Sequence, residues 1–311
     1  MPEKEIKIGL ALGGGGAKGA AHIGILRVLE KNGIKISAVS GASAGSVIGA
    51  GYALGVPIDE IEKNLVKLNN NKFFRISNFH IFHESLIKSK DIAKVVKNIV
   101  GDSTFEDTKI PFRAVAVDLE TGTEVILDHG RLLDAIAASS AIPGIFSPHF
   151  IDSRYLVDGG LLDNVPVLPL RAMKDLDIII GVEIRTLTSR QYISGMIWEK
   201  YYNKPKAFKL YPGKLSQIKL NFSLMIHILL RSIDILMEET QATRYAKAMP
   251  DIIIRPEVGS ISFLEFNKYQ MALDAGTRAA EEEMPKILAL IEKKKQELSK
   301  SGTYGGLEPP H

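Results

Sequence analysis

The residue with the clearest potential for chemistry is Ser43, at the centre of the run Gly41-Ala42-Ser43-Ala44-Gly45. The run lies between a short apolar segment, residues 36–40, and a stretch of small residues that favours a helix from Ser43 to Leu54. A tight turn from a strand into a helix admits only small flanking residues, and it places the serine Oγ above the sheet. This context predicts a nucleophilic serine, although the same pattern also occurs in glycine-rich helix starts for packing reasons alone.

A second glycine-rich turn, Gly13-Gly14-Gly15-Gly16-Ala17-Lys18-Gly19, precedes the serine. It separates the apolar run Ile6–Leu12 from a helical pattern that extends to about Lys31. Backbone amides at such a turn, beside a helix N-terminus, can hold a phosphate or an oxyanion. We interpret the turn as an oxyanion-binding loop, with close packing of helix on strand as the alternative.

Two nucleotide-binding patterns compete for the same glycines. Gly14, Gly16 and Gly19 satisfy the dinucleotide fingerprint, which also requires an acidic residue about 20 positions further on. The chain has Val39-Ser40 at that place. A phosphate-binding P-loop would need serine or threonine directly after Lys18, where this chain has glycine. A nucleotide-binding oxidoreductase is therefore the less favoured enzyme class.

The proton acceptor for Ser43 is predicted to be a carboxylate. None of the histidines has a recognisable catalytic context; they are His22, His80, His83, His129, His149, His227 and His311. Asp158 is the first candidate, because it ends the strand-like segment Tyr155–Val157 and begins the turn Asp158-Gly159-Gly160. Spacing alone leaves three competitors, Asp118, Asp152 and Asp163.

The elements that must position these groups alternate between strand and helix. Strand, turn and helix follow one another twice within the first 55 residues, which predicts a mainly parallel sheet covered by helices. A hairpin is expected from residues 112–118 and 123–127, and an apolar strand over Asp177–Ile184. Beyond it we expect a polar and aromatic stretch to about 215, and then a helix, a strand and a final helix over about 216–248, 251–255 and 266–299.

Composition excludes several classes of protein. The 311 residues carry 39 Lys and Arg against 36 Asp and Glu, a net charge of +3, which is too weak to indicate nucleic acid. The absence of cysteine excludes disulfides, thiolate catalysis and cysteine-ligated metal sites. No signal peptide and no stretch of 18 uncharged residues is apparent. We therefore expect a cytoplasmic protein.

The motifs together, in this order, resemble the patatin-like phospholipase family over roughly residues 8–184. Gly14–Gly19 resembles the oxyanion-hole loop of the family, Gly41–Gly45 its nucleophile elbow, and Asp158–Gly160 its D-G-[AG] motif. Ser139–Pro148 resembles a fourth block that helps to shape the site. Plant members usually have aspartate where this chain has glycine at position 13, whereas bacterial relatives commonly have glycine.

The resemblance implies a patatin-like three-layer α/β/α fold and a role for each motif residue. Ser43 would be the nucleophile and Asp158 the base, in a dyad that needs no metal or organic cofactor. The oxyanion hole would comprise Gly14, Gly15, Gly16 and Lys18, and the elbow and turn would be shaped by Gly41, Gly45, Gly159 and Gly160. The implied activity is hydrolysis of lipid acyl esters through an acyl-enzyme; an acyltransferase on the same site and a non-enzymatic binding module stay open.

Three regions are expected: a catalytic domain over residues 6–185, a mostly helical region over 186–299 packed on it, and a flexible tail over 300–311. The apolar segment Phe222–Met237 favours a core or homodimer helix over an interfacial one. Residues 69–83 contain four phenylalanines and are interpreted as a surface loop or lid over a site. Lipid or ester substrates and transient contact with a membrane surface are the expected partners, without nucleic acid.

Overall fold

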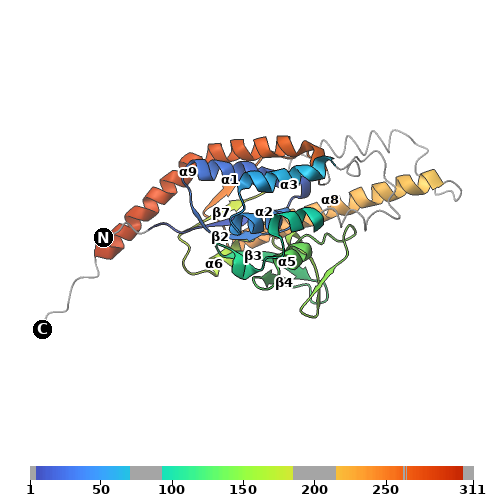
Figure 1. Ribbon diagram of the computed structural model, residues 1–311, viewed down its shortest axis with the longest axis horizontal. Helices are drawn as coiled ribbons and strands as arrows, with labels where there is room; N and C mark the ends of the chain where they lie inside the picture. Colours follow the sequence, from blue (N-terminus) through green and yellow to red (C-terminus); the bar gives the residue numbers. More distant parts are fainter. Residues whose placement is uncertain (1–4, 71–92, 185–214, 262, 264, 304–311) are drawn as a thin grey trace.

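The computed structural model describes residues 5–70, 93–184, 215–261, 263 and 265–303 (Figure 1). These residues form one mixed sheet between two layers of helices, as expected from the alternation of strands and helices. The expected lid stretch from residue 71 onward and the polar stretch over 186–214 lie outside the described residues.

The sheet has eight strands in the order β5-β6-β3-β2-β1-β7-β8, with β4 on the other edge of β3. Neighbouring strands in β3-β2-β1-β7-β8 are parallel, whereas β4, β5 and β6 form the antiparallel pairs. The expected hairpin is confirmed as β3 and β4. The bounds are β1 Ile8–Leu12, β2 Ile36–Gly41, β3 Phe112–Asp118, β4 Glu124–Leu127, β5 His149–Ile151, β6 Arg154–Asp158, β7 Ile178–Val182 and β8 Ile252–Ile254.

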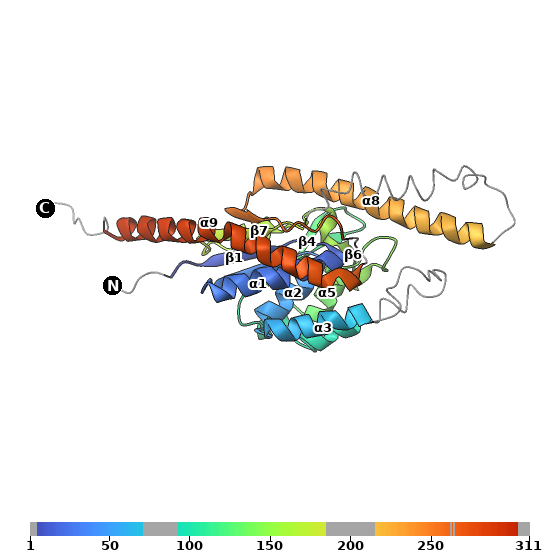
Figure 2. The same ribbon diagram turned by 90° about the horizontal axis from the view of Figure 1, so that it is seen from above.

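Helices cover both faces of the sheet (Figures 1 and 2). One face carries α1 Ala21–Lys31, α2 Ala44–Ala53, α3 Ile58–Asn70, α5 Leu132–Ser139 and α9 Tyr269–Thr303. The other carries α6 Val167–Arg171 and α8 Leu215–Lys247. Short 3₁₀ turns occupy η1 Gly16–Ala20, η4 Phe105–Asp107, η5 Gly159–Leu161 and η7 Phe266–Lys268, and residues 93–100 are helical.

Side chains of the central strands alternate between the two helical layers. Leu10 and Leu12 of β1 pack into the cluster shared with α1, α2 and α9, whereas Ala11 packs on the α6 side. All five residues of β1 are buried, which is typical of a parallel strand covered on both faces. The core therefore fixes the ends of β1 and β2, from which both glycine-rich turns begin.

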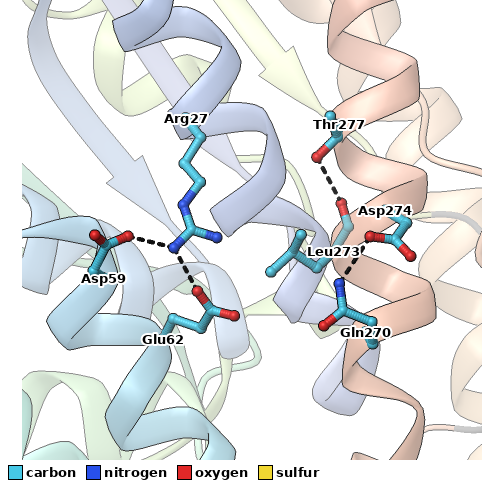
Figure 3. A network of polar contacts seen from close by, with 7 residues as sticks. All are labelled: Arg27, Asp59, Glu62, Gln270, Leu273, Asp274 and Thr277. Atoms are coloured by element: carbon cyan, nitrogen blue, oxygen red, sulfur yellow. Dashed lines mark hydrogen bonds and ion pairs between the residues drawn. The ribbon is translucent and has the colours of Figure 1, made fainter.

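The helical layer on the first face is joined by close contacts along α1. Arg27 of α1 pairs with Asp59 and Glu62 of α3 (Figure 3). On its other side α1 lies against α9, where a Cβ at Gly24 would come within 2.6 Å of Thr277 Oγ1. These contacts hold α3 and α9 in place around the start of α2.

The C-terminal residues contribute to the same sheet and core. The strand β8 pairs with β7, and α9 packs along α1. Several apolar side chains of α8 are exposed instead, namely Ile228, Leu229, Ile235 and Leu236. Within the described part of the chain, no helix combines the length and the apolar character needed to cross a bilayer.

Candidate active site

Ser43 lies in the turn between β2 and α2, as the sequence predicts. It is the residue before the first turn of α2, with φ 50° and ψ −123°. A positive φ is strained for a residue with a side chain, at a typical cost of about 1–3 kcal/mol, and such strain clusters at active sites. The backbone amide of Ser43 donates to the carbonyl oxygen (3.2 Å) and Oγ (3.1 Å) of Ser139, which fixes the turn.

The glycines that flank the serine have no room for a side chain. A Cβ on Gly41 would lie 2.6 Å from the carbonyl of Gly45, and a Cβ on Gly45 would overlap the carbonyl of Leu12 on β1. Both contacts are with backbone, which cannot move aside as a flexible side chain can. This steric limit explains the two glycines of the predicted elbow.

Asp158 lies at the end of β6, and its carboxylate reaches Ser43. Its Oδ1 accepts a hydrogen bond of 2.8 Å from the amide of Gly160, and the Ser43 side chain lies close enough to lower the pKa of the carboxyl. Burial raises the pKa of Asp158 to about 6, and the hydrogen bonds from Ser43 and Gly160 oppose this rise. The structure thus brings Ser43 and Asp158 together, with a carboxylate that is still largely ionised at neutral pH.

The three competing aspartates are placed differently. Asp118 accepts hydrogen bonds from the backbone amides of Glu120 and Thr121 in the β3–β4 turn. Asp152 lies in the β5–β6 turn, 3.7 Å from the His129 ring. Asp163 is buried, and among the described residues neither of its carboxylate oxygens has a hydrogen-bond partner.

No histidine among the described side chains hydrogen-bonds to Ser43. His22 is fully buried, and its Nε2 lies 2.8 Å from the carbonyl oxygen of Gly13, directly before the glycine loop. Burial lowers the pKa of His22 to about 4, so the ring is neutral and Nε2–H can donate to that carbonyl. His129 and His149 contact aspartates at the surface, and the side chains of the other four lie outside the described residues.

The predicted oxyanion loop packs directly against the serine. A Cβ on Gly14 would lie 3.1 Å from Ser43 Cβ, and a Cβ on Gly15 would lie 2.6 Å from Cγ2 of Ile184. Gly16 has φ +56°, which favours glycine. The glycine run therefore lets the backbone itself approach the reacting hydroxyl.

The amides of this loop are not equivalent. The Gly14 amide donates to both the carbonyl oxygen and Oδ1 of Asn164, each at 3.1 Å. Within the described part of the chain, the amides of Gly15 and Gly16 donate no hydrogen bond. These two amides are therefore the ones available to an oxyanion, while the Gly14 amide fixes the loop to Asn164.

A cleft of about 740 Å³, open mouth included, lies in front of the pair. Ser43, Asp158, Gly14, Gly15 and the buried Lys18 line it. It is completed by residues that sequence reasoning missed, which are Asn164, Glu183, Asp234, Glu238 and Gln241. Only Asn164 gave a usable signal, because it closely follows the Asp-Gly-Gly turn; Glu183 directly follows β7 and the others belong to α8, far away in sequence.

The Asp-Gly-Gly turn is also tightly packed. A Cβ on Gly159 would overlap the carbonyl of Val115 on β3, and one on Gly160 would lie 2.5 Å from Met237 Cε on α8. Across the residues that the structure describes, no three His, Asp or Glu side chains gather as a metal site. The arrangement comprises a hydroxyl, a carboxylate and two backbone donors, the groups needed for acyl transfer.

Comparison with known proteins shows which family the chain resembles. The profile of the patatin-like phospholipase family matches residues 10–171. An uncharacterized NTE family protein of Mycobacterium tuberculosis is 38% identical over 178 residues, which cover 57% of this chain and 49% of that protein. Lysophospholipase NTE1 of Debaryomyces hansenii is 27% identical over 284 residues, 88% of this chain and 18% of that protein.

The chain spans about half the length of the mycobacterial relatives that it matches. Among solved structures, VipD from Legionella pneumophila superimposes with a TM-score of 0.50 at 15% identity, over 94% of this chain and 67% of that chain. The likeness to VipD concerns the fold.

Proposed function

This chain belongs to the patatin-like phospholipase family, and from that premise we propose that it is a serine acyl hydrolase acting on fatty-acyl esters of lipids. One observation carries the proposal: the Ser43 side chain and the buried Asp158 carboxyl lie together in one cleft, beside the amides of Gly15 and Gly16, which donate no hydrogen bond within the described part of the chain. A nucleophile, a proton acceptor and an oxyanion site within one cleft are the parts that ester cleavage requires.

In the first half-reaction, Ser43 Oγ attacks the carbonyl carbon of the ester while its proton passes to Asp158. The amides of Gly15 and Gly16 hold the negative charge that develops on the carbonyl oxygen, and one such donor typically contributes about 10²–10³ in rate. Collapse of the tetrahedral intermediate breaks the bond to the alcohol oxygen, which takes the proton from Asp158. The alcohol leaves, and the acyl group stays on Ser43.

In the second half-reaction, water attacks the acyl-enzyme and gives its proton to the same carboxylate. Cleavage of the Ser43 ester then releases the fatty acid and returns the proton to Oγ. An alcohol in place of water would make the enzyme an acyltransferase, so the two activities share every step up to the acyl-enzyme.

The membrane surface is the place where such an enzyme would meet its substrate, and α8 supports this part of the proposal. Ile228, Leu229, Ile235 and Leu236 are exposed, and positions 228 and 235, like 229 and 236, are seven residues apart on one side of the helix. Ile233 and Met237 of the same helix line the cleft. An apolar helix face beside the cleft entrance would place the cleft at the lipid headgroups. A cytoplasmic location and a homodimer stay predictions.

The test is product analysis on a mixed panel of phospholipids, lysophospholipids and short esters, with the released acids and acyl products identified by mass spectrometry. Wild-type protein should release fatty acid, and Ser43→Ala and Asp158→Asn should each abolish that release while the circular dichroism spectrum is retained. Products in which the acyl group is esterified to an acceptor alcohol, in place of free fatty acid, would favour the acyltransferase. Full activity in either variant would refute the proposal.

A further inference from the structure

A second cavity meets the first at Ser43. It has a volume of about 820 Å³, open solvent included, and it extends from Ser43 between η1, α2, α3, the helical residues 93–100 and the start of α9. Ser43, Ile142 and Phe263 line both cavities. Gly15 faces the cleft, whereas Gly16 faces the second cavity, so the two candidate oxyanion donors lie at the junction.

The two cavities differ in chemical character. The cleft carries five charged side chains, Lys18, Asp158, Glu183, Asp234 and Glu238, among apolar ones such as Leu161 and Met237. No charged side chain is found among the described residues that line the second cavity; apart from Ser43, Ser140 and two glycines, its walls are alanine, valine, isoleucine, leucine and aromatic residues. An ester has the same asymmetry when one side of its carbonyl is a hydrocarbon chain and the other a polar alcohol.

We propose that the second cavity binds the acyl chain of the substrate and that Leu65 and Val95 limit the length of that chain; the inference rests on the proposed hydrolase function. With the carbonyl at the junction, the chain would pass Gly16 and Val47, one helical turn beyond Ser43, and the alcohol would lie in the charged cleft.

The position of Leu65 and Val95 follows from the layering of the helices. The helix α2, which begins directly after Ser43, packs on β1, β2 and β3, whereas α3 packs on α1 and α2 (Figure 2). Leu65 on α3 and Val95 in the helical residues 93–100 therefore form the wall of the cavity that lies away from the serine. Val95 is buried and Leu65 is half-buried, so a change of volume at either position is a change in cavity length.

The experiment compares kcat/KM for p-nitrophenyl esters from acetate to palmitate, each normalised to acetate. For wild-type protein the ratio should rise about fourfold per methylene until the cavity is filled. Val95→Phe should move the maximum to chains at least two carbons shorter, and Leu65→Ala should move it to longer chains. Val56→Phe is the matched control: Val56 is half-buried on a groove remote from Ser43, and its variant should keep the wild-type profile.

Opposite shifts in the two cavity variants support the acyl-chain site, because damage to folding would not lengthen the preferred chain. Identical profiles for wild type, Val95→Phe and Leu65→Ala would overturn it. If Val95→Phe does not fold, Leu65→Ala alone decides. Hydrolysis of the p-nitrophenyl esters at a rate that does not depend on chain length would agree with the hydrolase and contradict the acyl-chain site. A protein that hydrolyses none of the esters would refute the proposed function itself.

Discussion

The pH dependence of ester hydrolysis gives a quantitative test of the role of Asp158. A carboxylate that accepts the Ser43 proton must be ionised, so the rate of acylation should follow the ionised fraction of Asp158. Burial raises the pKa of this group to about 6, with opposition from the hydrogen bonds of Ser43 and Gly160. Because the pKa is raised rather than lowered, activity is lost as the pH falls through 6.

The expected change is large enough to separate a buried from an ordinary aspartate. With a pKa of about 6, roughly 90% of Asp158 is ionised at pH 7 and roughly 9% at pH 5, so kcat/KM should fall about tenfold. An aspartate with the ordinary pKa of 3.8 would stay more than roughly 90% ionised over the same range.

The assay is hydrolysis of a short p-nitrophenyl ester, followed at the isosbestic wavelength of the product between pH 5 and 8. Circular dichroism at each pH controls for acid unfolding, and return to pH 7 should restore full activity. If kcat/KM stays constant from pH 7 to pH 5 in protein that remains folded, ionisation of Asp158 does not control the rate, and its role as the base is refuted.

Three further outcomes follow from the packing around the site. Gly15→Ala should lower kcat by about 10²-fold, because its Cβ would lie 2.6 Å from Ile184 Cγ2 and displace the amide; the double variant with Ile184→Ala should recover part of the loss, and no recovery would argue against a steric cause. Burial and the nearby Glu124 raise the pKa of Asp163 to about 8, so its contribution to stability is lost as the pH rises from 3.8 to 8. Between pH 5 and 7, the unfolding free energy of the wild type should fall by up to about 2.7 kcal/mol in urea titrations because of this group, and Asp163→Asn should not show that fall. An equal dependence of stability on pH in both proteins would contradict this. Leu236→Ser on α8 (62% exposed in the wild type) should weaken flotation with phosphatidylcholine vesicles, whereas Leu288→Ser on α9 (45% exposed) should not; equal flotation would remove the α8 contact.

The local parts of the site could be predicted from the sequence because their causes are local. Gly41 and Gly45 are required because a Cβ at either position would meet backbone close to Ser43 or on the adjacent strand. The sequence of the five residues Gly41–Gly45 is enough to recognise this steric pattern. The β3–β4 hairpin and the alternation of strands and helices depend in the same way on short-range turns and periodicity. The meeting of Ser43 with Asp158 required the strand order as well, which the resemblance to a family supplied.

The remaining parts depend on contacts between distant segments. The oxyanion loop was expected to use Gly14, Gly15 and Gly16 alike, but Asn164, 150 residues away, occupies the amide of Gly14. The apolar pattern of Phe222–Met237 favoured a core or dimer helix; Ile235 and Leu236 are exposed in the single chain and the neighbouring Ile233 lines the cleft, so this part of the helix is not buried in the core. Periodicity marks an apolar face, but which neighbour covers that face is decided by tertiary packing.

The proposed function requires that the carboxylate of Asp158 activates the hydroxyl of Ser43. Covalent labelling with a fluorophosphonate, followed by intact-mass and peptide mass spectrometry, measures this reactivity without a choice of lipid substrate. We expect one label per chain, located on Ser43, at a rate that falls about 10²–10⁴-fold in Asp158→Asn. A label on another residue, or an Asp158→Asn variant that reacts as fast as the wild type, would contradict it.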